Sequence, residues 1–147
     1  MIKDLSVKLV ENDDDLLDVA LLKKGWDSEK GLIFVEDVLD KVIRLNEVGS
    51  NFWIAKIGRV GVGYAVGLLR SDIYSSQGIY VSPDYRRNGI GLMLKQAQID
   101  FAKSLRCERI STWVDDKNKA SIELQRKAGF ELVVTHGGYQ ANLFLGK

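Results

Sequence analysis

The sequence predicts an α/β protein of the α+β type, with a mixed, mostly antiparallel central sheet of about six to seven strands flanked by about four helices. Apolar residues recur with helical spacing in several segments. Three strand-like segments, 51–57, 59–70 and 74–81, are joined by links short enough for hairpins, so these strands are expected to be antiparallel. With 147 residues, the chain is long enough for one domain with a core and short for two, so we expect a single domain over residues 1–147.

The N-terminal segment indicates a strand followed by a helix. Residues 6–10 alternate polar and apolar side chains, as a half-buried strand does. Asn12 then precedes three aspartates, and Lys23-Lys24 precedes Gly25. An N-cap, acidic residues in the first turn, basic residues in the last turn and a glycine just past the end are the usual signals of a helix. We therefore expect a helix of about three turns that ends before Gly25, with residues 25–28 as a connection.

The rest of the chain continues the alternation of helices and strands. A second helix, ended by Gly49, is indicated by apolar residues at i, i+3, i+4, i+7 and i+8, namely Val35, Val38, Leu39, Val42 and Ile43. A third helix, from Ile90 to about Leu105, has one apolar stripe formed by Ile90, Leu94, Ala97, Phe101 and Leu105. A strand (109–114), a helix ending at Ala128, and two strands (130–134 and 139–145) follow. The predicted order is β-α-α-β-β-β-α-β-α-β-β.

Composition excludes several classes of function. The formal net charge is +1, so electrostatics gives no reason to expect nucleic-acid or membrane partners. Cys107 is the only cysteine, which rules out an intramolecular disulfide and fits a reducing compartment. The N-terminus is charged from Lys3 onward and has no signal-peptide core, so we expect a cytoplasmic protein.

The turn between residues 81 and 90 is the strongest functional signal. It joins a strand to a helix and contains two arginines, Asn88 and Gly89, and Gly91 follows at the start of the helix. A helix start exposes unpaired N–H groups and the positive end of the dipole, so such a turn suits a phosphate or pyrophosphate. The alternative is a basic turn with no ligand, in which a glycine is needed for a positive φ.

These residues resemble the acyl-CoA pyrophosphate loop of the GNAT N-acetyltransferase superfamily. The resemblance consists of Arg86-x-x-Gly89-x-Gly91 and the lead-in Val81-x-Pro83-x-Tyr85. It implies acetyl-CoA as acyl donor without a metal, a small-molecule or peptide amine as acceptor, and a sheet splayed between its fourth and fifth strands. It leaves a homodimer and other acyl donors open. The implied cofactor-binding residues are Ile79, Tyr80, Val81, Arg86, Arg87, Asn88, Gly89, Ile90, Gly91, Asn118 and Gln125.

A second segment is similar to another signature of the superfamily but departs from it at one position. Asn118 would open a helix that closes with Lys127-x-Gly129-Phe130, and this Asn contacts the CoA arm in the family. An N-cap role for Asn118 is equally compatible with the pattern. At Gln125 many relatives have a tyrosine that protonates the leaving thiolate, and an amide has no titrating proton to give.

The general acid and base are therefore open at the level of sequence. Tyr139 and Tyr80 are the candidates for the acid, although a buried tyrosine in a sheet often serves packing alone. The fourth strand has no carboxylate, so His136 is the candidate base, with a solvated loop histidine as the alternative. Direct attack of an amine on acetyl-CoA is the leading hypothesis. A catalytically weak acyl-CoA sensor or partner module is the rival, because both proton-transfer groups of the family are missing.

Overall fold

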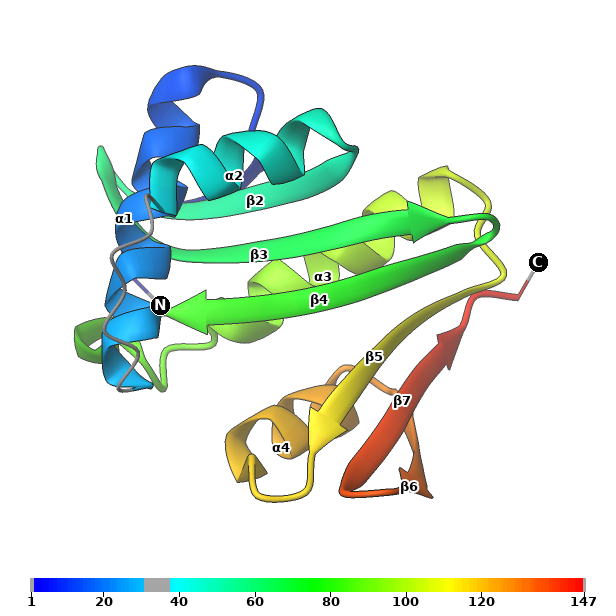
Figure 1. Ribbon diagram of the computed structural model, residues 1–147. Coiled ribbons are helices and arrows are strands. Elements are labelled where there is room, and N and C mark those ends of the chain that lie inside the picture. The colour runs from blue at the N-terminus through cyan, green and yellow to red at the C-terminus, as the bar shows by residue number, and fades with distance from the viewer. Residues whose placement is uncertain (1, 31–37, 147) are drawn as a thin grey trace.

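The computed structural model describes residues 2–30 and 38–146, and in them seven strands form one mixed sheet in the order β1-β2-β3-β4-β5-β7-β6 (Figure 1). The elements in chain order are β1 (Leu5–Leu9), α1 (Asp13–Glu29), α2 (Val38–Glu47), β2 (Ser50–Ile57), β3 (Val60–Arg70), β4 (Ile73–Val81), the 3-10 turn η1 (Pro83–Tyr85), α3 (Ile90–Ser104), β5 (Arg109–Asp115), α4 (Lys119–Lys127), β6 (Glu131–Thr135) and β7 (Gly138–Phe144). All neighbouring strands are antiparallel except β4 and β5. The predicted fold class and element order are confirmed.

The core lies in two layers, one on each face of the sheet. Helices α1 and α2 cover one face of β2, β3 and β4, where Val19, Phe52 and Tyr64 are buried. Helix α3 crosses the other face and packs on β1 to β5, where Leu94, Ile110 and Tyr74 are buried. In Figure 1 these two layers lie in front of and behind the sheet. Over the described residues, no helix combines the length and the apolar content that a membrane span requires.

Helix α1 is longer than the sequence predicts. Asn12 caps it as expected, since its side chain accepts a hydrogen bond from the N–H of Asp15 at 2.8 Å. The helix then continues through Gly25 to Glu29, so the prediction of an end before Gly25 and a connection over 25–28 is wrong. A Cβ at Gly25 would lie 3.3 Å from the hydroxyl of Tyr80. The glycine therefore allows close approach of β4 to the helix, and tertiary packing decides its place rather than helix termination.

Smaller differences occur at other boundaries. Helix α2 is described from Val38, and Val35 of its predicted stripe lies outside the described residues. Leu105 is exposed, so the apolar stripe of α3 ends at Phe101. Phe130 precedes β6 instead of opening it; its ring is buried and its N–H donates to the carbonyl of Gln125.

Strands β4 and β5 separate soon after they meet. Their parallel pairing is confined to Ile73–Ser75 against Arg109–Ser111. A bulge at Gln77 shifts the register of β4 against β3, while β5 stays paired with β7 over its whole length. Figure 1 shows β5 and β7 swinging away from β4 below this point. The splayed sheet implied by the family resemblance is confirmed.

Candidate functional site

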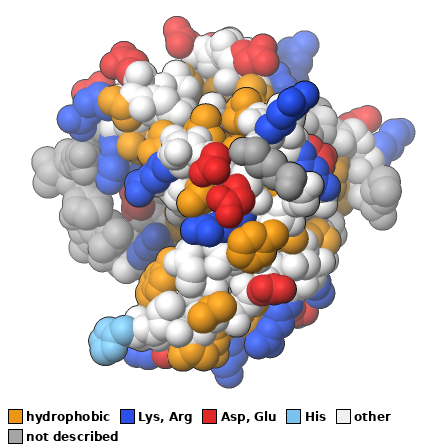
Figure 2. All heavy atoms as spheres, turned by 90° about the vertical axis from the view of Figure 1, so that its right-hand side faces the viewer, with side chains coloured by type: hydrophobic (Ala, Val, Ile, Leu, Met, Phe, Trp, Pro, Cys, Tyr) orange, Lys and Arg blue, Asp and Glu red, His pale blue; other side chains and the backbone are white. Residues whose placement is uncertain are grey.

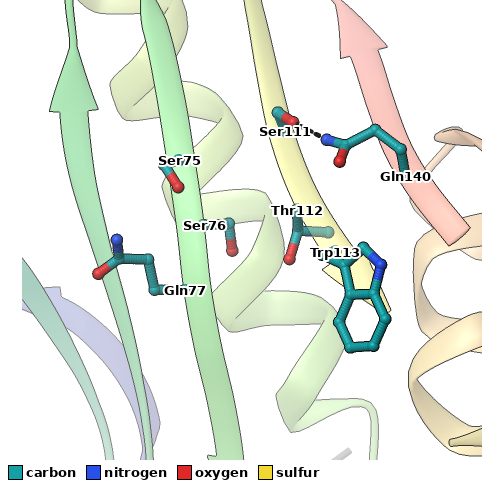
Figure 3. A pocket seen from close by; sticks show the side chains of 7 residues that line it. All are labelled: Ser75, Ser76, Gln77, Ser111, Thr112, Trp113 and Gln140. Atoms are coloured by element: carbon teal, nitrogen blue, oxygen red, sulfur yellow. Dashed lines mark hydrogen bonds between the residues drawn. The ribbon is translucent and has the colours of Figure 1, made fainter. Parts of the chain in front are cut away.

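A polar hollow of about 460 Å³ marks the point where β4 and β5 part. Four hydroxyl side chains, two amides and one indole line it: Ser75, Ser76, Gln77, Ser111, Thr112, Trp113 and Gln140. Because side chains alternate along a strand, Ser76 falls on the α3 side with buried Tyr74, and Thr112 falls there with Ile110 and Val114. Figure 3 shows Ser76 and Thr112 between the two strands, and Gln140 reaching across from β7 to the hydroxyl of Ser111.

In the described part of the chain, the edge of β4 that faces β5 has no strand partner beyond Ser75. Unpaired N–H and C=O groups along a strand edge favour the addition of an extended ligand. The hollow therefore offers both an edge for an amide-containing chain to lie against and hydroxyl groups to contact its reactive end.

The start of α3 has the form of an anion site. Gly89 is the N-cap with φ of +78°, and no atom lies within 4 Å of the position a Cβ would take. Among the described residues, no side chain caps this helix, so its first N–H groups remain available to a ligand. The Asn88 side chain instead donates to the carbonyls of Tyr85 and Arg86 at 3.1 Å each, which fixes the loop. The predicted residues from Arg87 to Gly91 are thus brought together at one helix start.

The side chain of Arg86 is bound elsewhere. Its Nε donates to the carbonyl of Val81 at 2.8 Å, and its guanidinium bonds both carboxylate oxygens of Glu29 at 2.8 and 2.9 Å. Glu29 is the last residue of α1, a position that no sequence motif marks. The predicted contact between the Arg86 side chain and a pyrophosphate stays a prediction, and it requires this guanidinium to leave Glu29.

Tyr80 belongs to the same cluster. Its ring stacks on Trp26 with 5.4 Å between ring centroids, and its hydroxyl donates to Glu29 at 2.5 Å. Burial, and then the hydrogen bond to Glu29, raise the pKa of Tyr80 to about 12. The same hydrogen bond, together with Arg86, lowers the pKa of Glu29. The Tyr80 proton is thus held by a carboxylate, which weakens its candidacy as the acid.

The other predicted residues lie apart from this cluster. Ile79 and Val81 pack on the α3 side of the sheet. Tyr139 is on β7, opposite Val114 of β5 and Val134 of β6. His136 is exposed in the turn between β6 and β7. Within the described part of the chain, no hydrogen bond joins Tyr80, Tyr139 and His136, so their catalytic roles stay predictions.

Helix α4 supplies Asn118 and Gln125. The Asn118 side chain accepts from the N–H of Ser121 at 3.1 Å, which is the predicted N-cap geometry. Gln125 is only 4% exposed, and its Oε1 has no hydrogen-bond partner among the described residues. A buried acceptor without a donor is costly unless a ligand satisfies it. The amide N–H groups of a CoA arm are donors of the required kind, so the site fits acyl-CoA.

Two buried polar residues of α3 were missed by the sequence interpretation. Lys95 and Gln98 are almost completely buried and both contact Ser76 at the hollow. Gln98 occupies the apolar stripe between Leu94 and Phe101, where a polar residue is unexpected. That break in the pattern is the signal that sequence reasoning had available.

Among the described residues, no three side chains of the His, Cys, Asp and Glu types are grouped to hold a metal ion. Acidic and basic side chains are interspersed on the face in Figure 2, with no large area of one sign.

Comparison with known proteins gives a consistent result. Residues 11–130 match the model of the acetyltransferase (GNAT) family. An uncharacterised N-acetyltransferase of Methanocaldococcus jannaschii is 28% identical over 89 residues, which are 56% of this chain and 39% of the relative. The chain thus spans about two fifths of the length of that relative.

Solved structures share the fold. YncA of Salmonella typhimurium, solved with its cofactor acetyl-CoA, superposes with a TM-score of 0.81 at 18% identity, over 99% of this chain and 96% of that one. The PaiA N-acetyltransferase of Thermoplasma acidophilum, in complex with coenzyme A, gives 0.75 at 15% identity, over 95% and 99%. An acetyltransferase of Streptococcus agalactiae gives 0.80 at 18% identity, over 98% and 100%. Together with the family model, which covers most of the sequence, these findings establish that the chain belongs to the GNAT acetyltransferase family.

Proposed function

We propose that the protein is an acetyl-CoA-dependent N-acetyltransferase that moves an acetyl group to a primary amine by direct attack in a ternary complex. The observation that carries this proposal is the alignment of three features: an uncapped α3 start, an unpaired β4 edge, and a polar hollow where β4 and β5 part. Residues 1–147 act as one cytoplasmic domain in this proposal. The acceptor is a small molecule or a peptide amine.

Each part of the acyl donor has a suitable place. The pyrophosphate would lie against the N–H groups of residues 87–91, where the helix dipole favours negative charge. The amide arm would lie along β4 beyond Ser75 and reach the unsatisfied Oε1 of Gln125. The thioester would then meet the hollow, where backbone N–H groups of β4 polarise its carbonyl.

The acceptor would approach from the α1 side of β4. Trp26, Tyr80 and Glu29 lie there, at the end of α1. A carboxylate next to aromatic rings suits an ammonium group before it loses its proton. Glu29 thereby supplies, from a distant helix, the carboxylate that the sequence of β4 lacks.

The rival function is an acyl-CoA sensor with little or no transfer. It is favoured by one observation, that Gln125 is buried where many relatives have a proton-donating tyrosine. The two functions share acetyl-CoA binding and differ in turnover, so one set of variants can test both.

Acetyl-CoA binding is tested by thermal shift on the wild type and on Gly91→Glu. Gly91 is a better position than Gly89, whose φ of +78° would strain any side chain, because a Cβ at Gly91 has 3.9 Å of clearance. Ligand at about a hundred times its Kd should stabilise the wild type by roughly 2.7 kcal/mol, or about 5–10 °C in Tm. Gly91→Glu should abolish the shift, whereas the neutral Gly91→Gln should keep more of it.

Turnover is then measured as release of free thiol with a panel of primary amines. Thiol release that depends on amine supports the transferase. Acetyl-CoA binding without thiol release on any amine would favour the sensor, and absence of a thermal shift in a folded wild type would exclude both.

A further inference from the structure

Lys95 is a lysine in an unusual place. It lies on the inner side of α3, about one turn after Gly91, and only 1% of its surface is exposed. Its Nζ is 3.0 Å from the hydroxyl oxygen of Ser76 and 4.6 Å from the ring centroid of Phe130. Lysines are almost never fully buried without a partner charge, because removing an ammonium from water is costly. Within the described residues, Lys95 forms no ion pair, so packing alone does not account for its presence.

Within the described residues, no charged group on the elements packed against α3 forms an ion pair or hydrogen bond with Lys95. On β5, Asp115 is exposed, and on α4 the exposed residues include Glu123 and Lys127, which pair with each other at 3.0 Å. On the other strands that α3 packs against, Tyr74 packs against Trp53 and Phe101, and Lys8 and Lys56 bind Asp15. Tyr64 and Tyr80 pack with Trp26 on the α1 face, Arg70 is exposed, and Arg109 of β5 lies over the Phe144 ring. Burial is therefore the cause that lowers the pKa of Lys95, to about 7. Near neutral pH both the charged and the neutral form of this amine are populated.

Ser76 connects Lys95 to the hollow. The Ser76 hydroxyl lines the hollow and donates to Oε1 of Gln98 at 2.7 Å. The Gln98 amide is oriented by its Nε2, which donates to the carbonyl of Val66 at 3.1 Å. Because Oε1 of Gln98 can only accept, the Ser76 proton points to it and the Ser76 oxygen accepts from Lys95. If the Ser76 hydroxyl rotates toward the hollow, it can donate its proton to a group bound there. Lys95 can then give a replacement proton to the Ser76 oxygen.

We propose that Lys95 and Ser76 form a proton relay that delivers a proton to the sulfur leaving the acyl group. This inference rests on the proposed transferase function and supplies the acid that Gln125 cannot be. As the new C–N bond forms and the C–S bond breaks, the sulfur takes the Ser76 hydroxyl proton, and Ser76 takes one from the Lys95 ammonium. The acylated nitrogen loses one proton, which returns to the neutral Lys95 through Ser76 or water. An acceptor that enters as an ammonium first gives one further proton to solvent, and Lys95 and Ser76 end the cycle in their starting protonation states.

The test compares Lys95→Met with the wild type and with Lys103→Met, an exposed lysine of the same helix. Methionine keeps the length of the side chain and removes a buried charge, so the fold should be retained. With an amine that the wild type acetylates, Lys95→Met should lower the turnover number by about 100-fold or more and leave the Kd for acetyl-CoA within about twofold. Ser76→Ala should give a similar loss, and Lys103→Met none.

Two pH profiles separate a proton relay from a merely structural role. At saturating substrates, wild-type turnover should decline as the pH rises through about 7, and this decline should be absent from Lys95→Met. The unfolded state binds more protons than the folded state between the lowered pKa of about 7 and the ordinary value of 10.5. Wild-type stability should therefore rise with pH across that interval, and Lys95→Met should lack this rise.

The relay and the transferase proposal would be contradicted by different experimental results. Near-normal turnover of Lys95→Met with an unchanged pH profile would overturn the relay and leave the transferase proposal standing. Joint loss of turnover and acetyl-CoA binding would overturn the relay in favour of a binding role. Absence of thiol release from the wild type would overturn the transferase and the relay together, since no leaving sulfur would need a proton.

Discussion

Replacing Glu29 by Gln tests whether the Arg86 side chain binds the pyrophosphate. In the structure this guanidinium bonds both oxygens of Glu29, so it must leave that carboxylate before it can reach a ligand at the start of α3. The two side chains are 45% and 36% exposed, and ion pairs of such exposure contribute about 0.2–1 kcal/mol. Removing the charge at Glu29 removes this competition. The Kd for acetyl-CoA should fall by roughly 1.4- to 5-fold.

The assay is isothermal titration of acetyl-CoA at neutral pH, with Glu47→Gln as the control for loss of one exposed acidic charge from α2. The gain should shrink as salt is added, since salt screens exposed pairs. Weaker binding by Glu29→Gln would refute the reasoning. It would show that Glu29 holds Arg86 as a brace between β4 and α1, and that the predicted side-chain contact with the pyrophosphate is wrong.

Two further predictions concern stability. Gly67→Ala should lower the free energy of unfolding, measured in urea, by about 1–3 kcal/mol, because the new Cβ would collide with the buried Tyr74 ring. Gly61→Ala is the control and should be close to neutral, since its Cβ would have 3.4 Å of clearance. Equal stability of the two variants would contradict this packing argument. Asp15→Asn should flatten the acid end of the stability profile. Hydrogen bonds and ion pairs with Lys56 and Lys8 lower the pKa of Asp15 below its ordinary value of 3.8. The stability that the Asp15 carboxylate contributes above that pH is therefore lost as the pH falls through the pKa of the folded state. Identical dependence of urea stability on pH for the wild type and Asp15→Asn, from pH 7 to 3, would contradict this role.

The parts of the fold that sequence predicts are those whose causes are local. The start of α3 is determined by consecutive residues, because Gly89 provides the positive φ and the loop leads directly into an amphipathic helix. The Asn118 cap and the hairpin at Gly58 are local in the same sense. The family resemblance added the splay between β4 and β5, which no local pattern contains.

The parts that sequence misses depend on contacts between distant segments. Helix α1 passes through Gly25 because Trp26 packs on Tyr80, which is 54 residues further along the chain. Glu29, at the end of the same helix, enters the site through its hydrogen bond with the Tyr80 hydroxyl. From the sequence alone, Lys95 cannot be distinguished from a surface lysine of a helix. Its contact with Ser76 depends on how α3 packs against β4.

Titrating groups on the two sides of β4 have pKa values that are shifted in opposite directions. On the α1 face, burial and Glu29 raise the pKa of Tyr80 to about 12, so this phenol keeps its proton at neutral pH. On the α3 face, burial lowers the pKa of Lys95 to about 7, so this amine exchanges its proton in the same range. Pairs of groups whose environments push their pKa values apart commonly mark sites of proton transfer. Since the amine must lose a proton and the sulfur must gain one, an exchangeable group next to the hollow is more useful than a phenol bound to a carboxylate. In the proposed relay, Lys95 therefore supplies the proton that Gln125, in place of tyrosine, cannot give.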